Sequence, residues 1–291
     1  MTSVKIELQA LKIIEKNFYR SGNPLGIKTK SPAEILGISR NECRTTLYTG
    51  QSYQLMPYVL RILSIIDKFG KLEKLANLFS NLNFSKLIIP KMENRFYSAI
   101  RGAANALKNA KIDFGVLLNE PYDGSLYYDL GMDHIVDENE KIIRSEFEKN
   151  KVERIITISP HSCYMLKKVY SLDVEIIHIY ELISNIKCNK KAVIHDPCIL
   201  ARKLGIVTQL RIFNAVEPEN TGKNTLCCGG PIEILFPQLS LQIAKSRGNE
   251  LISTGLNKIA TACPVCLMNF LKAGFDARDI LSFFSGDANE D

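Results

Sequence analysis

The sequence is poor in several residues and patterns that mark whole classes of protein. It has no tryptophan and only four histidines in 291 residues, which limits metal sites built on imidazole ligands. No apolar run approaches the roughly 18 residues that a membrane-spanning helix requires, and the N-terminus lacks a signal-peptide pattern. No stretch resembles a nucleic-acid-binding motif. These absences predict a cytoplasmic protein with no transmembrane segment and no nucleic-acid partner.

The composition is that of a globular protein with a substantial core. Hydrophobic residues make up 46% of the chain and charged residues 23%. The length suits one large domain or two of ordinary size. The net charge of +6 comes from 37 basic and 31 acidic residues that are interleaved along the chain. This balance is compatible with an anionic partner, but a lysine-rich solvated surface is the simpler interpretation.

Cysteine is the most informative residue type. Five of the eight cysteines lie in one C-terminal stretch: Cys198, Cys227, Cys228, Cys263 and Cys266. Because disulfides are disfavoured in the cytoplasm, this clustering predicts metal binding or redox chemistry. The other three, Cys43, Cys163 and Cys188, stand alone and are interpreted as buried structural thiols.

Helical and strand-like periodicities alternate along the chain. Helices are predicted over 4–18, from the capping box Ser31-Pro32-Ala33-Glu34, over 53–69 and over 91–111. Strands are predicted over 45–48, 114–118, 155–158, 175–179, 192–195 and 258–262. Helical segments separate most of these strands. The sequence therefore predicts an α/β fold of βαβ units with mostly parallel sheets.

The chain also repeats itself. Residues 152–162 align with 256–266 without a gap, so that Ser159 falls on Cys263 and Ser162 on Cys266. The match predicts that two parts of the chain share one local plan, a strand followed by a helix with Pro at its first position.

Two further matches extend the repeat. Tyr122-Asp123-Gly124 falls on Cys227-Cys228-Gly229 with one residue of slip, and Gln51 falls on Cys198 in order but not in spacing. The first copy must carry an insertion of about 40 residues between these landmarks. We therefore expect two pseudo-symmetric βαβ-rich halves, residues 41–187 and 188–291, preceded by an N-terminal helical extension over residues 1–40.

The cysteines of the second half lie where a metal cluster could use them. Cys198 and Cys263 each follow a predicted strand, and the carboxyl ends of parallel strands form the usual ligand crevices of open sheets. Pro264 suits the first turn of the next helix, whose N-terminus favours thiolates and anionic clusters. The glycines of the turn 227–230 permit close approach of the backbone to a cofactor.

These motifs resemble a known family. HDPC at 195–198, CCGG at 227–230 and CPVC at 263–266 are similar to the cysteine-rich CCG domain. This domain occurs in the B and D subunits of heterodisulfide reductases, in iron–sulfur subunits of glycolate and lactate oxidases, and in heterodisulfide-reductase-like sulfur-oxidation complexes. Its members usually carry two copies in tandem. The present chain looks like the B-type member of a heterodisulfide reductase, with an intact second copy and a degenerate first copy.

The resemblance implies one iron–sulfur cluster per chain, of the [4Fe-4S] type, cubane or non-cubane, held by the five clustered cysteines. His195, Arg202 and Gly229 would lie around it. The implied function is an oxidoreductase subunit, active only within a heterodisulfide-reductase-like complex. It would transfer electrons to or from a disulfide, persulfide or thiol of a substrate or carrier protein. Ferredoxin-type and flavin-containing subunits are the implied partners, and no catalytic residue is assigned.

The first half departs from the family at every ligand position. The matching residues are Gln51, Tyr122, Asp123, Ser159 and Ser162, which are poor ligands for a soft metal. We therefore expect no cluster there, with the five residues gathered around a vacated pocket. His161 is interpreted as structural or as a lining residue of that pocket.

Three other functions remain open. A non-catalytic assembly or electron-relay subunit would also need the cluster. An iron–sulfur subunit of a lactate- or glycolate-type oxidase is a second possibility, although the sequence has no CxxCxxC run. A four-thiolate zinc site is the third, but it leaves the fifth cysteine unexplained.

Two polar residues beside the motif have structural interpretations. His195 fits a satisfied strand-end histidine and Asp196 the cap of the following helix. Arg202 follows Cys198 by one helical turn, so its charge is placed near the cluster or in a solvated basic turn with Lys203.

Overall fold

Two parallel sheets form the centre of the computed structural model, which describes residues 2–38, 44–69 and 89–287. The first sheet has the order β1-β2-β3 and the second the order β5-β4-β6-β7. Every pair of neighbouring strands is parallel. The strands are β1 (Thr45–Tyr48), β2 (Arg154–Thr157), β3 (Glu175–His178), β4 (Lys191–His195), β5 (Asn214–Val216), β6 (Lys258–Thr261) and β7 (Asp276–Asp279). The predicted α/β class with parallel sheets is confirmed.

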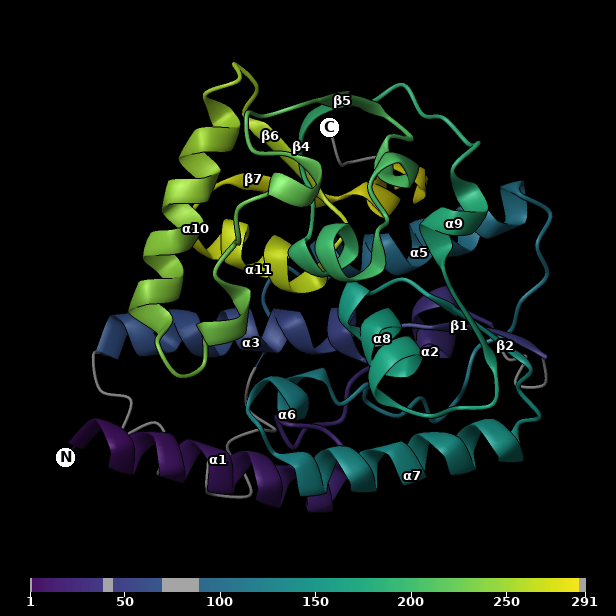
Figure 1. The fold of residues 1–291 in the computed structure, drawn as a ribbon, viewed down its shortest axis with the longest axis vertical. Helices are drawn as coiled ribbons and strands as arrows, with labels where there is room; N and C mark the ends of the chain where they lie inside the picture. The colour runs from purple at the N-terminus through teal and green to yellow at the C-terminus, as the bar shows by residue number, and fades with distance from the viewer. Residues whose placement is uncertain (1, 39–43, 70–88, 288–291) are drawn as a thin grey trace.

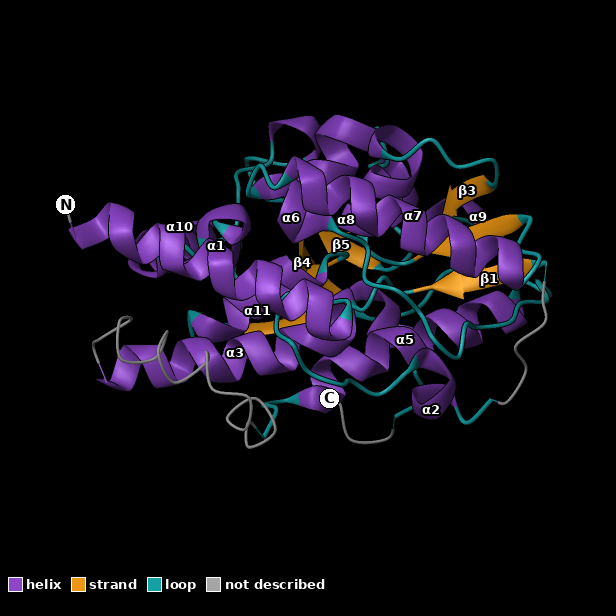
Figure 2. Ribbon diagram, turned by 90° about the horizontal axis from the view of Figure 1, so that it is seen from below, coloured by secondary structure: helices purple, strands orange, loops and turns teal. Residues whose placement is uncertain are grey.

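Helices cover both faces of the strands (Figures 1 and 2). The α-helices are α1 (Thr2–Ser21), α2 (Pro32–Leu36), α3 (Ser52–Phe69), α5 (Glu93–Asn109), α6 (Ser125–Asp129), α7 (Asp133–Lys149), α8 (Pro160–Tyr164), α9 (Ile179–Ile183), α10 (Pro237–Ile252) and α11 (Pro264–Lys272). Two π-helices are η2 (Met165–Val169) and η3 (Ile199–Leu204). Short 3-10 helices are η4 (Thr208–Leu210), η5 (Gly222–Asn224), η6 (Gly230–Ile232) and η7 (Ile280–Phe284). Among the described residues, none of the helices combines the length and apolarity needed to cross a membrane.

The strand register reproduces the internal repeat of the sequence. Tyr48 of β1 pairs with Thr157 of β2, and His195 of β4 pairs with Thr261 of β6. The alignment of the two copies matches Tyr48 with His195 and Thr157 with Thr261, so the two pairs are equivalent. The order β1-β2-β3 also matches the order β4-β6-β7. The two sheets therefore share one local plan.

The strand predicted over 114–118 is reduced to one residue. Only Gly115 bridges to β1, through hydrogen bonds with Thr45 and Leu47. The bridge corresponds to the longer pairing of β5 with β4 in the second sheet. A glycine has no side chain to pack on a sheet, and Leu118 at the end of this segment is exposed. The prediction of a full strand here is therefore wrong, although Val116 and Leu117 are buried as the apolar pattern predicts.

A single hydrophobic core connects the two sheets. It includes Leu47 and Ile156 of the first sheet together with Val193 and Ile259 of the second. Helix α5, which belongs to the insertion of the first copy, packs against η7 at the end of the second. Gly102 makes this possible, because a Cβ there would lie only 1.8 Å from the carbonyl oxygen of Leu281. The inserted segment therefore fixes one half of the molecule to the other.

The N-terminal segment is helical, as predicted, and packs on the first half. Ile14 and Phe18 of α1 are buried, and the Phe18 ring meets the Tyr127 ring edge-on at 5.4 Å between centroids. Helix α2 has the predicted capping box: the Ser31 hydroxyl accepts from the Glu34 amide at 3.2 Å, and the Glu34 carboxylate accepts from the Ser31 amide at 2.7 Å. Helix α1 thus shares a core with α6 and α7.

Candidate metal centre

The five clustered cysteines meet at the carboxyl edge of the second sheet. Cys198 lies just past β4 and precedes the π-helix η3, while Cys263 follows β6 and caps the N-terminus of α11. Pro264 occupies the first turn of α11, and Cys266 lies in the same turn. Because neighbouring parallel strands end at the same edge, cysteines far apart in sequence are brought together.

The sulfur atoms form one continuous chain of contacts. Cys198 contacts Cys227, which contacts Cys228. Cys228 Sγ lies 3.1 Å from Cys266 Sγ, and Cys266 contacts Cys263. A disulfide would require about 2.05 Å between sulfurs. All seven cysteines in the described residues are free thiols. The eighth, Cys43, lies outside those residues.

The surroundings of two of these thiols lower their pKa and so favour the thiolate form. Hydrogen bonds from Cys198, Cys228 and the Gly229 amide lower the pKa of Cys227. For Cys263, burial alone would raise the pKa, but a hydrogen bond from its neighbour Cys266 and the nearby imidazolium lower it well below its usual value. Thiolates are the form of cysteine that binds metal. The arrangement is therefore that of a soft-metal site.

The centre is more open on one side than on the other. Cys228, Cys263 and Cys266 are buried, whereas Cys198 and Cys227 are half-buried. A cofactor held by all five would therefore face the protein interior through three of its ligands and approach the surface at two.

The CCGG turn depends on a glycine at its third position. Gly229 has φ of +85°, and a Cβ there would lie 2.7 Å from the Ser240 carbonyl oxygen in α10. Its amide donates to Cys227 Sγ at 3.3 Å. Gly124, the matching residue of the first half, has φ of +81°. Both copies of the repeat thus keep the left-handed turn, although only the second keeps the cysteines.

Two other residues predicted to lie around the cluster, His195 and Arg202, have different surroundings. His195 is buried, and one of its ring nitrogens lies within 4.8 Å of both Cys228 Sγ and Cys266 Sγ. Arg202 donates to the carbonyl oxygens of Lys223 and Thr225. It therefore braces the segment that leads into the CCGG turn.

The interpretation of Asp196 as the cap of the following helix is wrong. Its carboxylate accepts from the Gly222 amide at 2.7 Å and from Arg211 Nη2 at 2.9 Å. Hydrogen bonds and the charge of Arg211 outweigh burial and lower the pKa of Asp196. Asp196 instead connects the end of β4 to the loop that leads into the CCGG turn.

In the first half, Asp123 takes the place of one cysteine and forms a polar cluster. Its Oδ2 accepts from the Ser162 hydroxyl at 2.6 Å and from the Ser52 hydroxyl at 3.0 Å. A Cβ on Gly50 would lie 2.3 Å from Ser162 Oγ. Asp123 and Ser162, two of the five matched residues, therefore contact each other directly through a hydrogen bond.

The other three matched residues have different surroundings. The Tyr122 hydroxyl lies 3.2 Å from Ser125 Oγ and accepts from the Leu126 amide at 3.1 Å. Gln51 donates through its side chain to the Glu120 carbonyl at 2.6 Å. Ser159 is buried, and its hydroxyl has no hydrogen-bond partner within the described part of the chain. Tyr122 and Gln51 thus bond to partners other than Asp123 and Ser162.

Glu120 is a buried acid that sequence reasoning missed. Its carboxylate accepts from the Thr49 amide at 2.8 Å, from the Thr49 hydroxyl and from the Gln51 amide at 3.2 Å. Burial raises its pKa to about 7, although these hydrogen bonds act in the opposite direction. The group is therefore protonated in the folded protein at a pH where it is ionised in the unfolded chain.

This shift predicts a pH-dependent stability. Between about pH 4.5 and 7 the folded state binds more protons than the unfolded state, so the free energy of unfolding falls as pH rises. Glu120→Gln keeps a hydrogen-bond acceptor but cannot ionise. As pH rises from about 4.5 to 7, we expect the free energy of unfolding of the wild type to fall by about 3 kcal/mol more than that of this variant. Urea unfolding of both proteins at several pH values measures the difference, and parallel curves would contradict the assignment.

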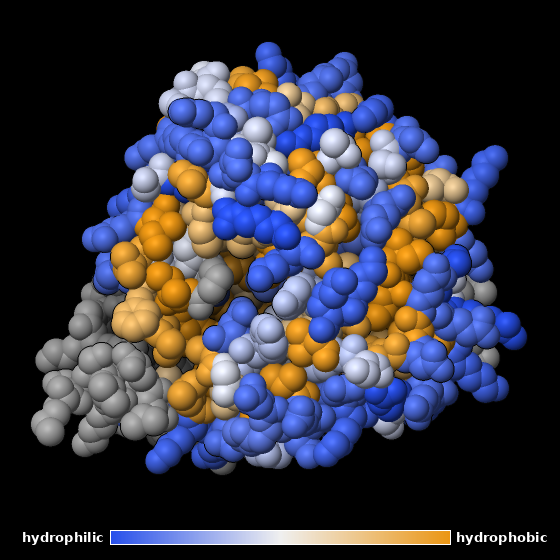
Figure 3. Space-filling model, in the orientation of Figure 1, coloured by the Kyte–Doolittle hydropathy of each residue, from blue (hydrophilic) through white to orange (hydrophobic). Residues whose placement is uncertain are grey.

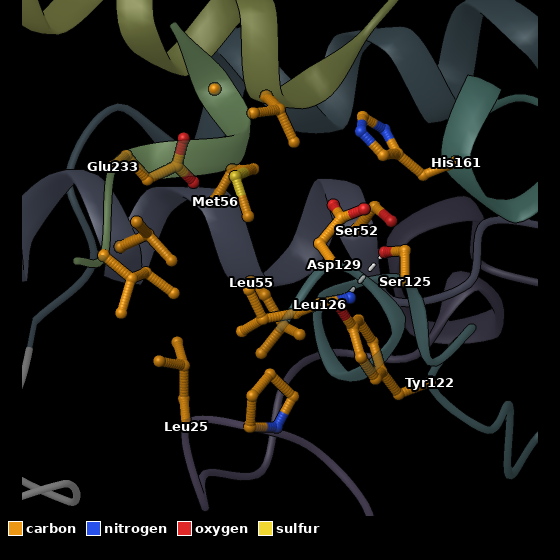
Figure 4. Close-up of a pocket in the computed structure, with 15 residues that line it drawn as sticks. Leu25, Ser52, Leu55, Met56, Tyr122, Ser125, Leu126, Asp129, His161 and Glu233 are labelled. Carbon is orange, nitrogen blue, oxygen red and sulfur yellow. Dashed lines mark hydrogen bonds between the residues drawn. The ribbon is translucent and has the colours of Figure 1, made fainter. Parts of the chain in front are cut away.

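A cavity of about 60 Å³ lies between the two halves beside the cysteines. Figure 4 shows Glu233 entering it from one side and His161 from the other, with Met56 between them and with Asp129 and Ser52 below His161. His161 Nδ1 lies 3.8 Å from Cys263 Sγ. Glu233 is 6% exposed, and its Oε2 has no hydrogen-bond partner among the described residues. The cavity therefore combines titratable groups, one of which, His161, contacts the end of the sulfur chain at Cys263.

Burial and mutual charge set the protonation of these groups. Burial opposes the charged form of His161, but the Cys263 thiolate and the nearby carboxyls raise its pKa to about 9. Burial raises the pKa of Glu233 well above its usual value and also raises that of Asp129. Near neutral pH the cavity therefore holds a protonated imidazole, and burial favours the neutral form of the Glu233 carboxyl group.

Comparison with known families identifies the class of the site. Residues 192–271 match the cysteine-rich domain named CCG, and this span contains all five cysteines of the sulfur chain. This part of the chain is therefore similar to the cysteine-rich CCG domain, in agreement with the resemblance of the three motifs.

Curated relatives include redox proteins. The chain is 25% identical over 207 residues to the D subunit of the dihydromethanophenazine:CoB–CoM heterodisulfide reductase of Methanosarcina mazei, covering 61% of this chain and 50% of that protein. It is 27% identical over 198 residues to the probable iron-sulfur-binding oxidoreductase FadF of Bacillus subtilis, covering 60% of this chain and 28% of FadF. A probable membrane-anchored ferredoxin of Chromohalobacter salexigens is 25% identical over 194 residues, covering 57% of this chain and 29% of the ferredoxin. The chain thus spans half or less of the length of these three proteins.

Proposed function

We propose that the chain is an iron–sulfur subunit of a heterodisulfide-reductase-like complex. It exchanges electrons with a disulfide, persulfide or thiol through one [4Fe-4S]-type cluster, cubane or non-cubane. The observation that carries this proposal is the continuous chain of five free cysteine sulfurs at the edge of the second sheet. The similarity to one component of a heterodisulfide reductase and to an iron–sulfur oxidoreductase supports it.

The donor set fits an iron–sulfur cluster better than zinc. Cys198, Cys227, Cys228, Cys263 and Cys266 would hold the cluster, which would supply electron transfer at sulfur. Zinc takes four ligands in a structural site, which leaves one of five adjoining thiols unused. The half-buried Cys198 and Cys227 side would bring the cluster near the surface. We propose this set as the ligands and the division 1–40, 41–187 and 188–291 as the domain organisation.

The first half is proposed to bind no cluster of its own. Asp123 and Ser162 satisfy each other there, together with Ser52, and oxygen groups of this kind bind iron–sulfur clusters poorly. The half instead contributes one wall of the cavity through Ser52, Asp129 and His161. A vacated copy of the repeat has thus become part of the surroundings of the surviving one.

The cavity is the proposed site where substrate sulfur reaches the cluster. Its apolar lining, which includes Leu55, Met56 and Val265, suits an aliphatic chain. Reducing a disulfide to two thiols consumes two electrons and two protons. Glu233 and His161 hold protons at the cavity wall, His161 within 3.8 Å of Cys263 Sγ. These side chains would orient the substrate and supply the protons that accompany the electrons.

Electrons are proposed to enter through the more open side of the centre. Cys198 and Cys227 are half-buried there, and Leu226 beside them is 46% exposed. Phe236 and Leu239, at the start of α10, are also exposed. Figure 3 shows apolar side chains gathered on this face over the region of α10. A ferredoxin-type or flavin-containing subunit would dock here, and the cytoplasm, where thiols stay reduced, suits such a complex.

A viologen assay tests the proposal. The anaerobically reconstituted protein, with reduced methyl viologen as electron donor, should reduce bis(hydroxyethyl) disulfide to thiols, and the Cys263→Ser variant should not. A cluster that viologen reduces without any thiol formation, alone or with its partner subunits, would instead make the chain an electron relay. Equal activity of the two proteins would contradict a role for the cluster.

A further inference from the structure

His195 is held by a donor that fixes its tautomer. Arg247 Nε donates to His195 Nδ1 at 3.3 Å. A guanidinium remains protonated in proteins, so it can only donate, and Nδ1 must present its lone pair. The imidazole is buried, and a ring that accepts at Nδ1 from a guanidinium is the neutral form. A neutral ring with a bare Nδ1 carries its proton on Nε2.

Arg247 is itself fixed in place. It is 2% exposed, which is unusual for arginine, and it ends in a set of polar partners. Its Nη1 donates to Glu250 Oε2 at 2.5 Å, and its Nη2 donates to the Asn220 carbonyl at 2.8 Å. The salt bridge to Glu250 balances the buried charge. The guanidinium therefore has little freedom to release His195.

The other ring nitrogen of His195, Nε2, is buried and has no hydrogen-bond partner in the described part of the protein, and the ring lies beside the cysteines. One of the ring nitrogens lies within 4.8 Å of both Cys228 Sγ and Cys266 Sγ. The Phe270 ring packs edge-on against the imidazole at 4.9 Å between centroids. A buried N–H left without an acceptor is costly, so the cluster sulfurs are its natural partners.

We propose that Arg247 is a positioning residue that holds His195 as an Nε2–H donor to the cluster, and so excludes His195 as a ligand. A metal-bound imidazole nitrogen must be free of its proton; the bond from Arg247 occupies Nδ1 and leaves the only proton on Nε2, the nitrogen without a partner in the described residues. Hydrogen bonds to cluster sulfur change the reduction potential, and a donor stabilises the more negative, reduced state. This inference rests on the proposed function for the presence of a cluster, whereas the tautomer is a property of the protein alone.

The potential is the first readout. His195→Leu removes the donor, whereas His195→Gln keeps an amide N–H in a side chain of similar reach. We expect His195→Leu and Arg247→Met to retain the iron content of the wild type and to shift the midpoint potential of the cluster downward, while His195→Gln stays close to the wild type. Potentiometric titration followed by EPR measures the shift. Equal potentials in the Leu and Gln variants would overturn the proposal.

Nitrogen spectroscopy is the second readout. In protein labelled with ¹⁵N-histidine, NMR of the metal-free form should show His195 with a proton on Nε2 and none on Nδ1, and Arg247→Met should disturb that assignment. In the cluster-loaded form, ENDOR should show a weak coupling to an exchangeable proton. A strong ¹⁵N coupling would make His195 a ligand and overturn the proposal. If the wild-type protein shows the expected tautomer but binds no iron, the proposed function is refuted and the assignment of the tautomer still holds.

Discussion

Cys263→Ser is expected to lose most of the iron that the wild type binds. Cys263 lies at the N-terminus of α11, where its thiolate is stabilised, and Ser cannot replace a soft thiolate ligand. Cys227→Ser should behave in the same way, because Cys227 links Cys198 to Cys228 in the sulfur chain. Iron per chain after anaerobic reconstitution measures the effect.

The matched controls are cysteines outside the sulfur chain. Cys188→Ser makes the same chemical change at a half-buried free thiol, and Cys163→Ser makes it at a fully buried one. Both should keep the iron content of the wild type. Similar iron content in all four variants would show that the five cysteines do not form the ligand set.

Glu233→Gln is expected to slow disulfide reduction by about 100-fold while the cluster stays intact. The amide has nearly the same shape as the protonated carboxyl group, so the cavity should keep its form. It cannot transfer a proton, and Glu233 Oε2 is the buried oxygen of the cavity that has no partner in the described residues. The rate with a small disulfide, measured beside iron content and the EPR spectrum, separates loss of chemistry from loss of cluster.

Glu219→Gln is the control for this change, because Glu219 is exposed and does not line the cavity. It should reduce the disulfide at the rate of the wild type. A Glu233→Gln protein with an unchanged rate would remove Glu233 from the proposed proton supply. It would leave His161, at the opposite wall, as the proton donor to be tested.

The regular elements and the cysteines could be predicted from the sequence because their signals are local. Apolar runs located β1, β2, β3, β4 and β6 to within a residue, and the Ser31 capping box appears as predicted. They missed β5 and β7, which are short or rich in charged residues, and predicted a strand over 114–118 that is reduced to one bridge. The repeat alignment matches Tyr48 with His195 and Thr157 with Thr261, and the matched residues take equivalent places in the register of the two sheets. Parallel strands then bring the cysteines to one edge without further information.

The acids of the site could not be predicted because their roles depend on distant packing. Glu120 and Glu233 look like ordinary surface residues in the sequence. Each becomes functional or titratable only through burial by segments far along the chain. The same holds for Asp196, whose partner Arg211 lies in another loop. Charged residues lie mostly at the surface, so a lone Glu gives no sign of an interior position.

Of the residues at the replaced ligand positions, some contact one another and others contact different partners. Asp123 and Ser162 meet through a hydrogen bond of 2.6 Å, as expected of side chains that fill one space. Tyr122 and Gln51 are longer and reach other partners, the Ser125 hydroxyl and the Glu120 carbonyl. Sequence alignment places a residue in the repeat, but the length and rotamers of its side chain decide what it contacts.

Metal analysis of the anaerobically reconstituted wild-type protein tests the central claim most directly. Five adjoining thiols in a region similar to the CCG domain predict a brown protein with about four or more irons per chain, an equivalent amount of acid-labile sulfide and an EPR signal on reduction. They also predict no stoichiometric zinc, since a fifth thiol exceeds the tetrahedral requirement of that metal. One tightly bound zinc per chain without labile sulfide would contradict the account.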